Sequence, residues 1–260
     1  MNVAAPPRSA ELEAAWSSAE YVRLRFEPRP SEQHYLVLSD LRRYLEPLRT
    51  DAPIRLLDYG AGPSPYRALF PHADYRRADY VATPHLDYVV DADSRVQEQD
   101  GLFDLVLSTQ VAEHLANPAS YFREAWRLLK PGGRLVVTTH GIWSDHGTPY
   151  DFQRWTAAGL ARDLAQAGFA DVRCSKLTAG HRAHLFLTLE ALAGFGGGRT
   201  RLRRLAGGAL QRMLRGLRPW LHRRADAWWP QLRVADLGPD PGSGPPLYII
   251  VAADCRRPAI

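Results

Sequence analysis

The amino-acid sequence predicts an α/β fold built on a doubly wound, mostly parallel sheet of seven strands. From residue 54 onward, short apolar runs of strand length alternate with stretches whose apolar residues recur at helical spacing. This alternation is typical of a parallel sheet that carries helices on both faces. The expected strands span residues 54–58, 76–80, 86–90, 103–108, 133–139, 169–177 and 247–253. The expected core helices span residues 64–70, 118–129 and 156–167.

The chain divides into four predicted segments. These are an N-terminal helical cap (1–50), a cofactor-binding core (51–178), a basic helical insertion (179–246) and a last core strand with the C-terminus (247–260). In the cap, Ser9 and Ser31 each precede a helical pattern, and serine is a favoured N-cap residue. We therefore expect two helices ahead of the core.

The composition is that of an ordinary soluble protein. Of the 260 residues, 45% are hydrophobic and 23% are charged. The N-terminus lacks the apolar stretch of a signal peptide, and no apolar run approaches the roughly 20 residues that span a bilayer. The two cysteines, Cys174 and Cys255, form no CxxC pair, so neither a zinc–thiolate site nor a disulfide framework is expected. We expect a cytoplasmic location.

The insertion is strongly basic. Ten arginines and one glutamate lie between residues 181 and 224, without any lysine or aspartate. Apolar residues from Leu202 to Leu221 recur on one side of a predicted helix, and most of the arginines fall opposite. The apolar side needs burial, and the alternatives are a lid, a subunit contact in a homodimer, or a peripheral membrane surface. Nucleic acid is the least favoured partner, because no aromatic residues are interleaved for base stacking.

A glycine-rich turn follows the first predicted strand, with Asp58, Gly60 and Gly62 in the order Asp-x-Gly-x-Gly. Parallel sheets bind ligands beyond the carboxyl ends of their strands, where glycine lets a ligand approach the backbone. The third glycine of the dinucleotide fingerprint is replaced by Pro65, which disfavours an NAD enzyme. About 20 residues further on, the second strand ends at Asp79, which suits hydrogen bonds from two ribose hydroxyls.

Three segments occur in the order and at the spacing of a known family. "LLDYGAG", "FDLVLSTQVAEHL" and "LLKPGGRLVVTTH" resemble the successive motifs of class I S-adenosylmethionine (SAM)-dependent methyltransferases, in particular the type 11 group. The resemblance runs from about residue 54 to residue 170. It implies a Rossmann-like fold, SAM as the cofactor and S-adenosylhomocysteine (SAH) as its product. One departure is Ser64, which takes the place of a small residue of the motif and is flanked by prolines.

The resemblance also implies a set of cofactor contacts. In the family, the acid after the third strand approaches the adenine amino group, the glycine loop passes the methionine moiety, and N-terminal helices close over SAM. Arg25 would suit the methionine carboxylate as a charged hydrogen-bond donor. Carried onto this sequence, the predicted cofactor-binding residues are Asp58, Gly60, Gly62, Asp79, Tyr80, Asp91, Ala92, Gln110, Tyr21 and Arg25.

The predicted acceptor site lies in the loop after the fifth strand. Residues 138–156 resemble the "THG…H..P.DywRwT" variant of a subset of these enzymes, often found near glycan or natural-product pathways. Histidine is the natural base at neutral pH, so we expect His146 to deprotonate the acceptor, with His140 as the second candidate. Tyr150 is expected beside them, and Asp145 or Asp151 would orient the imidazole. We interpret Arg154, Trp155 and Thr156 as structural residues that brace the loop and cap the next helix.

Two further patterns point to structure rather than chemistry. We expect His114 to pack behind the fourth strand and Glu113 to cap or pair nearby. No metal site is expected, because His140 and His146 lie in a loop six residues apart, and the His181–His184 pair lacks a matching second pair.

The sequence thus predicts a SAM-dependent methyltransferase that acts on an oxygen or nitrogen of a small-molecule or sugar-containing metabolite. The alternatives are a methyltransferase for RNA or another anionic polymer, with the basic insertion holding the backbone, and a non-catalytic protein with the SAM-binding fold.

Overall fold

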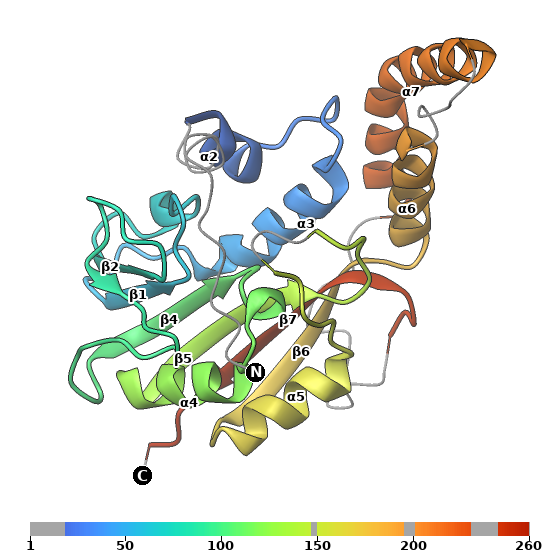
Figure 1. Cartoon of the computed structure of the whole chain (residues 1–260). Helices are drawn as coiled ribbons and strands as arrows, with labels where there is room; N and C mark the ends of the chain where they lie inside the picture. The colour runs from blue at the N-terminus through green and yellow to red at the C-terminus, as the bar shows by residue number, and fades with distance from the viewer. Residues whose placement is uncertain (1–18, 147–149, 195–200, 230–243, 260) are drawn as a thin grey trace.

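The computed structural model describes residues 19–146, 150–194, 201–229 and 244–259, with side chains from residue 207 onward in the third of these ranges. A seven-stranded sheet of order β3-β2-β1-β4-β5-β7-β6 forms its centre (Figure 1). The strands are β1 (Arg55–Tyr59), β2 (Asp74–Asp79), β3 (Tyr88–Val89), β4 (Phe103–Thr109), β5 (Leu129–His140), β6 (Ala170–Ala179) and β7 (Tyr248–Arg256). Only β7 runs antiparallel to its neighbours, β5 and β6. The predicted Rossmann-like, mostly parallel sheet is confirmed.

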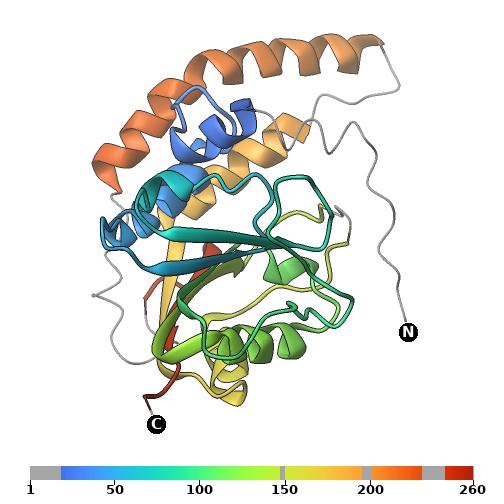
Figure 2. The ribbon, with the colours of Figure 1, turned by 90° about the vertical axis from the view of Figure 1, so that its left-hand side faces the viewer.

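Helices cover both faces of this sheet (Figures 1 and 2). Two helices, α4 (Pro118–Leu128) and α5 (Ala157–Gln166), pack with one core cluster that includes Phe103, Phe122 and Leu160. On the other face, α3 (Tyr35–Leu45) and α6 (His181–Ala193) pack with a second cluster. The helices α4 and α5 begin where the sequence predicts them, with Asn117 and Thr156 as N-caps that accept backbone hydrogen bonds.

Several predicted boundaries shift. The expected helix over residues 64–70 is only a 3-10 turn, Arg67–Leu69, and Ser64 ahead of it is held at a positive φ of 53°, outside the helical region. The α3 helix begins after His34, without a side-chain cap, so the expected cap by Ser31 is wrong. Ser9 and the start of the helix expected after it lie outside the described residues. The described part of that stretch contains a short helix, α2 (Ala19–Phe26).

The insertion contributes α6 and a long helix, α7 (Arg201–Trp228). Figure 2 shows α7 along the outer side of the layer that contains α2, α3 and α6, across the sheet from α4 and α5. Where side chains are described, the stripe from Leu202 to Leu221 is not the face that packs on the rest of the chain, because Met213 and Leu217 are 53% and 43% exposed; its burial by a second subunit or a membrane stays a prediction. The buried face is instead formed by Leu214, Arg218, His222 and Ala225.

Polar contacts fix the rotation of α7. His222 stacks on Tyr35 of α3, with ring centroids 5.3 Å apart. Asp226 accepts hydrogen bonds from Tyr35 and from Arg43 and Arg182. These contacts turn the helix away from the face that hydrophobicity alone predicts, because buried polar groups must find partners. None of the described α7 residues reaches the central cavity, so a lid role for α7 is not supported.

A buried ion pair joins the insertion to the cap. Arg182 of α6 is 2% exposed, and its Nη2 and Nε atoms donate to Asp40 of α3 at 2.6 and 2.9 Å. Thr178 Oγ1 donates to the same carboxylate at 2.9 Å. Breaking such a pair by removing one partner leaves an uncompensated buried charge. No helix among the described residues is long and apolar enough to cross a membrane.

Candidate active site

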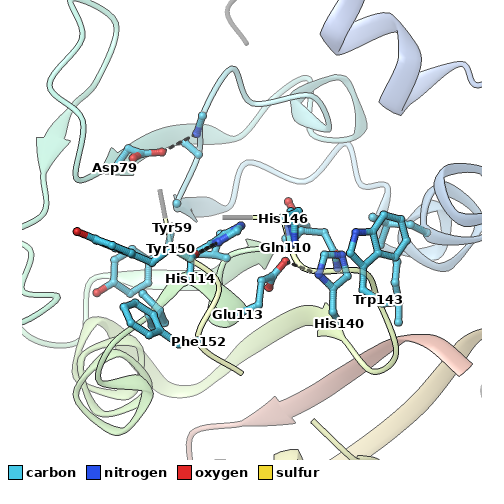
Figure 3. Close-up of a pocket in the computed structure, with 18 of the residues that line it drawn as sticks. Tyr59, Asp79, Gln110, Glu113, His114, His140, Trp143, His146, Tyr150 and Phe152 are labelled. Atoms are coloured by element: carbon cyan, nitrogen blue, oxygen red, sulfur yellow. Dashed lines mark hydrogen bonds and ion pairs between the residues drawn. The ribbon is translucent and has the colours of Figure 1, made fainter. Parts of the chain in front are cut away.

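A single cavity of about 870 Å³ opens at the carboxyl ends of β1, β2, β4 and β5 (Figure 3). This is the edge where parallel sheets bind ligands. Every predicted cofactor contact except Asp58 lines this cavity, as do the three residues predicted to act on the acceptor. The lining residues among them are Tyr21, Arg25, Gly60, Gly62, Asp79, Tyr80, Asp91, Ala92, Gln110, His140, His146 and Tyr150.

The glycine loop forms one wall. Gly60 has a φ of +81°, and a Cβ built there would lie 2.4 Å from Val111 Cγ2, so only glycine fits. The Gly60 amide donates to Ala78 O at 2.8 Å, which ties the loop to β2. The Gly62 amide donates to Asp79 Oδ2 at 2.8 Å. The acid at the end of β2 therefore holds the loop in place from the cavity side.

Asp58 lies beneath this loop instead of in the cavity. Its carboxylate is buried and accepts a hydrogen bond from Tyr75 Oη at 2.6 Å. Burial raises the pKa of Asp58 to about 7, in spite of that hydrogen bond. Its position indicates a supporting contact below the loop, whereas the sequence motif places it among the cofactor contacts.

The cap and the segment that follows β3 complete this part of the cavity. The guanidinium of Arg25 lies over the Tyr21 ring, 3.6 Å from its centroid. Asp91 Oδ1 accepts the amides of Asp93 and Arg95 at 3.0 and 2.8 Å, which fixes the carboxylate at the edge of the sheet. Together with the glycine loop, these groups form the wall that we expect to contact the cofactor.

The opposite end of the cavity is polar and aromatic. Asp151 Oδ2 lies 3.2 Å from His146 Nδ1 and accepts the His146 amide at 3.0 Å. Arg154 also donates to Asp151, and this hydrogen bond holds the pKa of the Asp151 carboxyl well below its usual range. Asp151 is thus a carboxylate that fixes the imidazole of His146.

His140 is placed differently from His146. It is buried and stacks on Trp143, with centroids 4.6 Å apart and an interplanar angle of 4°. Burial lowers the pKa of His140 to about 2, so the ring stays neutral at physiological pH. A base of such low proton affinity is poorly suited to the role that the sequence assigns to it as second candidate.

Glu113 and His114 also line the cavity, and the ring centroid of His114 lies 4.9 Å from that of His146 (Figure 3). Glu113 is fully buried, and its Oε2 accepts a hydrogen bond of 2.8 Å from Thr139 Oγ1. His114 Nδ1 donates to Tyr150 O at 2.5 Å. Glu113 does pair nearby, as expected, but His114 faces the cavity and does not pack behind the strand.

Sequence reasoning missed the apolar part of this end. Trp143 stacks on Phe186 of α6, with centroids 5.2 Å apart, and Phe152 lies beside Tyr150. Glu190 of α6 also lines the cavity and accepts Gln33 Nε2 at 2.9 Å. The insertion therefore contributes to the site through α6, and no local motif marks these residues.

This fold and this site define a class I SAM-dependent methyltransferase. Residues 31–174 match a family described as a methyltransferase domain, and the chain belongs to that family. Two solved structures of similar fold, at 16% and 15% identity, contain SAM and SAH.

The curated relatives match over a short segment only. A ubiquinone biosynthesis O-methyltransferase from Maricaulis maris is 38% identical over 48 residues, which is 18% of this chain and 19% of that protein. A second one, from Caulobacter vibrioides, is 44% identical over 48 residues, 18% of this chain and 19% of that protein. The matched segment thus spans about a fifth of the length of these relatives.

Two solved structures extend the likeness of fold over nearly the whole chain. Phosphoethanolamine N-methyltransferase 2 from Haemonchus contortus, in complex with SAM, has a TM-score of 0.52 at 16% identity, over 96% of this chain and 58% of that one. A SAM-dependent methyltransferase from Thermotoga maritima, described as a possible histamine N-methyltransferase, has a TM-score of 0.52 at 13% identity, over 92% and 94%. At these identities the likeness concerns the fold.

Proposed function

We propose that this methyltransferase transfers the methyl group of SAM to an oxygen or nitrogen of a small-molecule or sugar-containing acceptor. The observation that carries the proposal is that one cavity joins the glycine loop to the polar end around His146. Cavities of roughly 300–1,000 Å³ hold drug-sized ligands, so a volume of about 870 Å³ suits a cofactor with a compact acceptor beside it. The match to a ubiquinone biosynthesis O-methyltransferase, which covers 18% of this chain, is consistent with a small-molecule acceptor.

SAM binds in this proposal at the glycine-loop end. Asp79 accepts hydrogen bonds from the ribose hydroxyls, and Asp91 accepts one from the adenine amino group. Gly60 and Gly62 let the methionine moiety approach the backbone, and Arg25 donates to its carboxylate. The sulfonium methyl group then points toward the polar end of the cavity.

The acceptor binds at that polar end, beside His146, Tyr150 and Phe152. Methyl transfer is an in-line displacement, so the site has to align an acceptor lone pair with the C–S bond. His146 suits this task because Asp151 holds its ring in place, with 3.2 Å between His146 Nδ1 and Asp151 Oδ2. Trp143 and Phe186 supply the apolar wall against which the body of the acceptor packs.

The test is turnover with a panel of hydroxylated and amine-bearing small molecules, followed as SAH formation by mass spectrometry. His146→Ala should lower turnover at least about 100-fold, since misplacing reacting groups costs about that much, while SAM affinity stays unchanged. His72→Ala is the matched control, because His72 is exposed and lies outside the cavity. Equal turnover of both variants on an accepted substrate would remove His146 from the acceptor site.

A further inference from the structure

Three potential metal ligands meet at the acceptor end of the cavity. Glu113 and His114 come from the turn that follows β4, and His146 comes from the loop that follows β5. One ligand atom from each residue can be chosen so that all three lie within 4.8 Å of one another. A metal ion placed among them would contact two imidazoles and one carboxylate.

Both histidines are oriented in the way that metal ligands are. His114 Nδ1 donates to the carbonyl oxygen of Tyr150, and His146 Nδ1 lies 3.2 Å from the carboxylate of Asp151. A carbonyl or a carboxylate accepts only, so each ring carries its proton on Nδ1 and its lone pair on Nε2. A histidine that ligates a metal through one nitrogen usually donates its other N–H to such a partner, which fixes the tautomer and the ring orientation.

The carboxylate supplies a second, independent sign of a cation. Glu113 is fully buried, and within the described part of the chain its Oε1 atom makes no hydrogen bond. His140 Nδ1 approaches Oε1 to 3.2 Å, yet that nitrogen also has no hydrogen-bond partner among the described residues. A buried carboxylate oxygen without a partner is costly, and a bound cation would satisfy it.

We propose that Glu113, His114 and His146 bind one divalent cation at the acceptor end of the cavity. Two imidazole nitrogens and one carboxylate oxygen, with positions left open, suit a first-row transition ion such as Mn²⁺, Co²⁺ or Zn²⁺ better than Mg²⁺, which prefers an all-oxygen shell. The sequence predicts no metal here and assigns His146 as a base. In this arrangement His146 is a ligand instead.

The cation would define the acceptor chemistry, and this part of the inference rests on the proposed function. A divalent cation held there would make an acceptor hydroxyl more acidic, so that the hydroxyl could release its proton to solvent. Its oxygen lone pair then forms the bond to the SAM methyl carbon, while the C–S electron pair goes to sulfur and yields neutral SAH. The site therefore favours an oxygen acceptor, in particular one whose neighbouring oxygen also reaches the cation.

Calorimetry on the EDTA-treated chain, without SAM or acceptor, tests the site directly. We expect Co²⁺, Mn²⁺ or Zn²⁺ to bind at one site and Mg²⁺ to bind more weakly. His146→Ala should abolish this binding, and Asp151→Asn should weaken it by about 10- to 100-fold through loss of the charge that orients the imidazole. His184→Ala is the control for adventitious binding, because His184 is exposed beside His181 and lies outside the cavity.

Glu113→Gln provides a further test, with circular dichroism to verify that it folds. His146 is partly exposed, so His146→Ala keeps the test decisive even if the Glu113 variant unfolds. Binding that is absent in the wild type, or that survives in His146→Ala, would overturn the metal site. EDTA-resistant methyl transfer would then leave the proposed function standing. Metal binding without turnover on any small acceptor would instead overturn the proposed function alone.

Discussion

Asp79 at the end of β2 accepts a hydrogen bond from the backbone amide of Gly62, with 2.8 Å between the two atoms. One carboxylate therefore holds the glycine loop and faces the cavity in which we propose that SAM binds. We expect Asp79→Ala to weaken SAH binding by about 10- to 100-fold, as hydrogen bonds to a charged group contribute about 1.5–3 kcal/mol. Calorimetry with SAH measures the change.

Asp79→Asn separates the two roles of this residue. Its side-chain carbonyl can still accept the Gly62 amide, but it loses the negative charge, so we expect an intermediate affinity. Asp74→Ala is the control, because Asp74 begins the same strand and lies outside the cavity. An Asp79→Ala variant that binds SAH as tightly as this control would show that Asp79 does not contact the cofactor.

Gly60→Ala tests the close approach of the loop to Val111. The new Cβ would lie 2.4 Å from Val111 Cγ2 at a φ of +81°, so we expect a loss of about 1–3 kcal/mol in stability together with weaker SAH binding. Adding Val111→Ala should restore only part of the stability, since the backbone strain remains. Gly208→Ala in α7 has open space and should instead stabilise the helix by up to about 1 kcal/mol. Thermal unfolding that ranks the variants otherwise would contradict this account of the loop.

The ion pair between Arg182 and Asp40 yields a prediction about stability. Arg182→Met removes the buried cation from Asp40, which keeps only Thr178 and the half-exposed Arg43 as partners, and we expect a loss of about 3–5 kcal/mol in the free energy of unfolding. Combining it with Asp40→Leu should recover most of that loss, because the double variant buries no unpaired charge. Urea unfolding of the two single variants and the double variant measures the coupling. A single Arg182→Met variant with wild-type stability would show that the pair does not anchor the insertion.

His222 should make the fold sensitive to acid. It is buried against Tyr35, and Arg218, Arg182 and Asp226 lie nearby; burial lowers the pKa of His222 to about 4. The ring takes a proton near pH 6.5 in the unfolded chain but only near pH 4 in the folded one. The unfolded state thus binds more protons between these values, and stability falls as pH falls through this window.

His222→Phe removes that contribution while keeping an aromatic ring against Tyr35. We expect its melting temperature to fall less than that of the wild type between pH 6.5 and pH 4, with His72→Phe as the exposed control. Parallel pH profiles for the wild type and His222→Phe would mean that His222 does not titrate in a buried setting.

Motifs that are local in sequence predicted the fold and the cofactor side of the cavity. The glycine turn and the acids at the ends of β2 and β3 each follow directly from a strand, and the sheet brings strand ends together. The face of α7 that packs on the rest of the chain was not predicted, because Asp226 and His222 find partners in α3 that lie nearly 200 residues away. Hydrophobic periodicity carries no information about such polar contacts.

The acceptor side was predicted only in part for a similar reason. His146, Tyr150 and His140 stand in one recognisable loop, and all three line the cavity. Glu113 and His114 belong to a motif shared by the family and were interpreted as structural. Their approach to His146 depends on how the loop after β5 folds back, which local sequence does not encode.

Calorimetry of the purified chain with SAH, and in a separate titration with NAD, decides between a methyltransferase and a dinucleotide-dependent enzyme of the same fold class. We predict one SAH per chain with micromolar affinity and no detectable heat with NAD. Binding of NAD without binding of SAM or SAH would contradict the methyltransferase account.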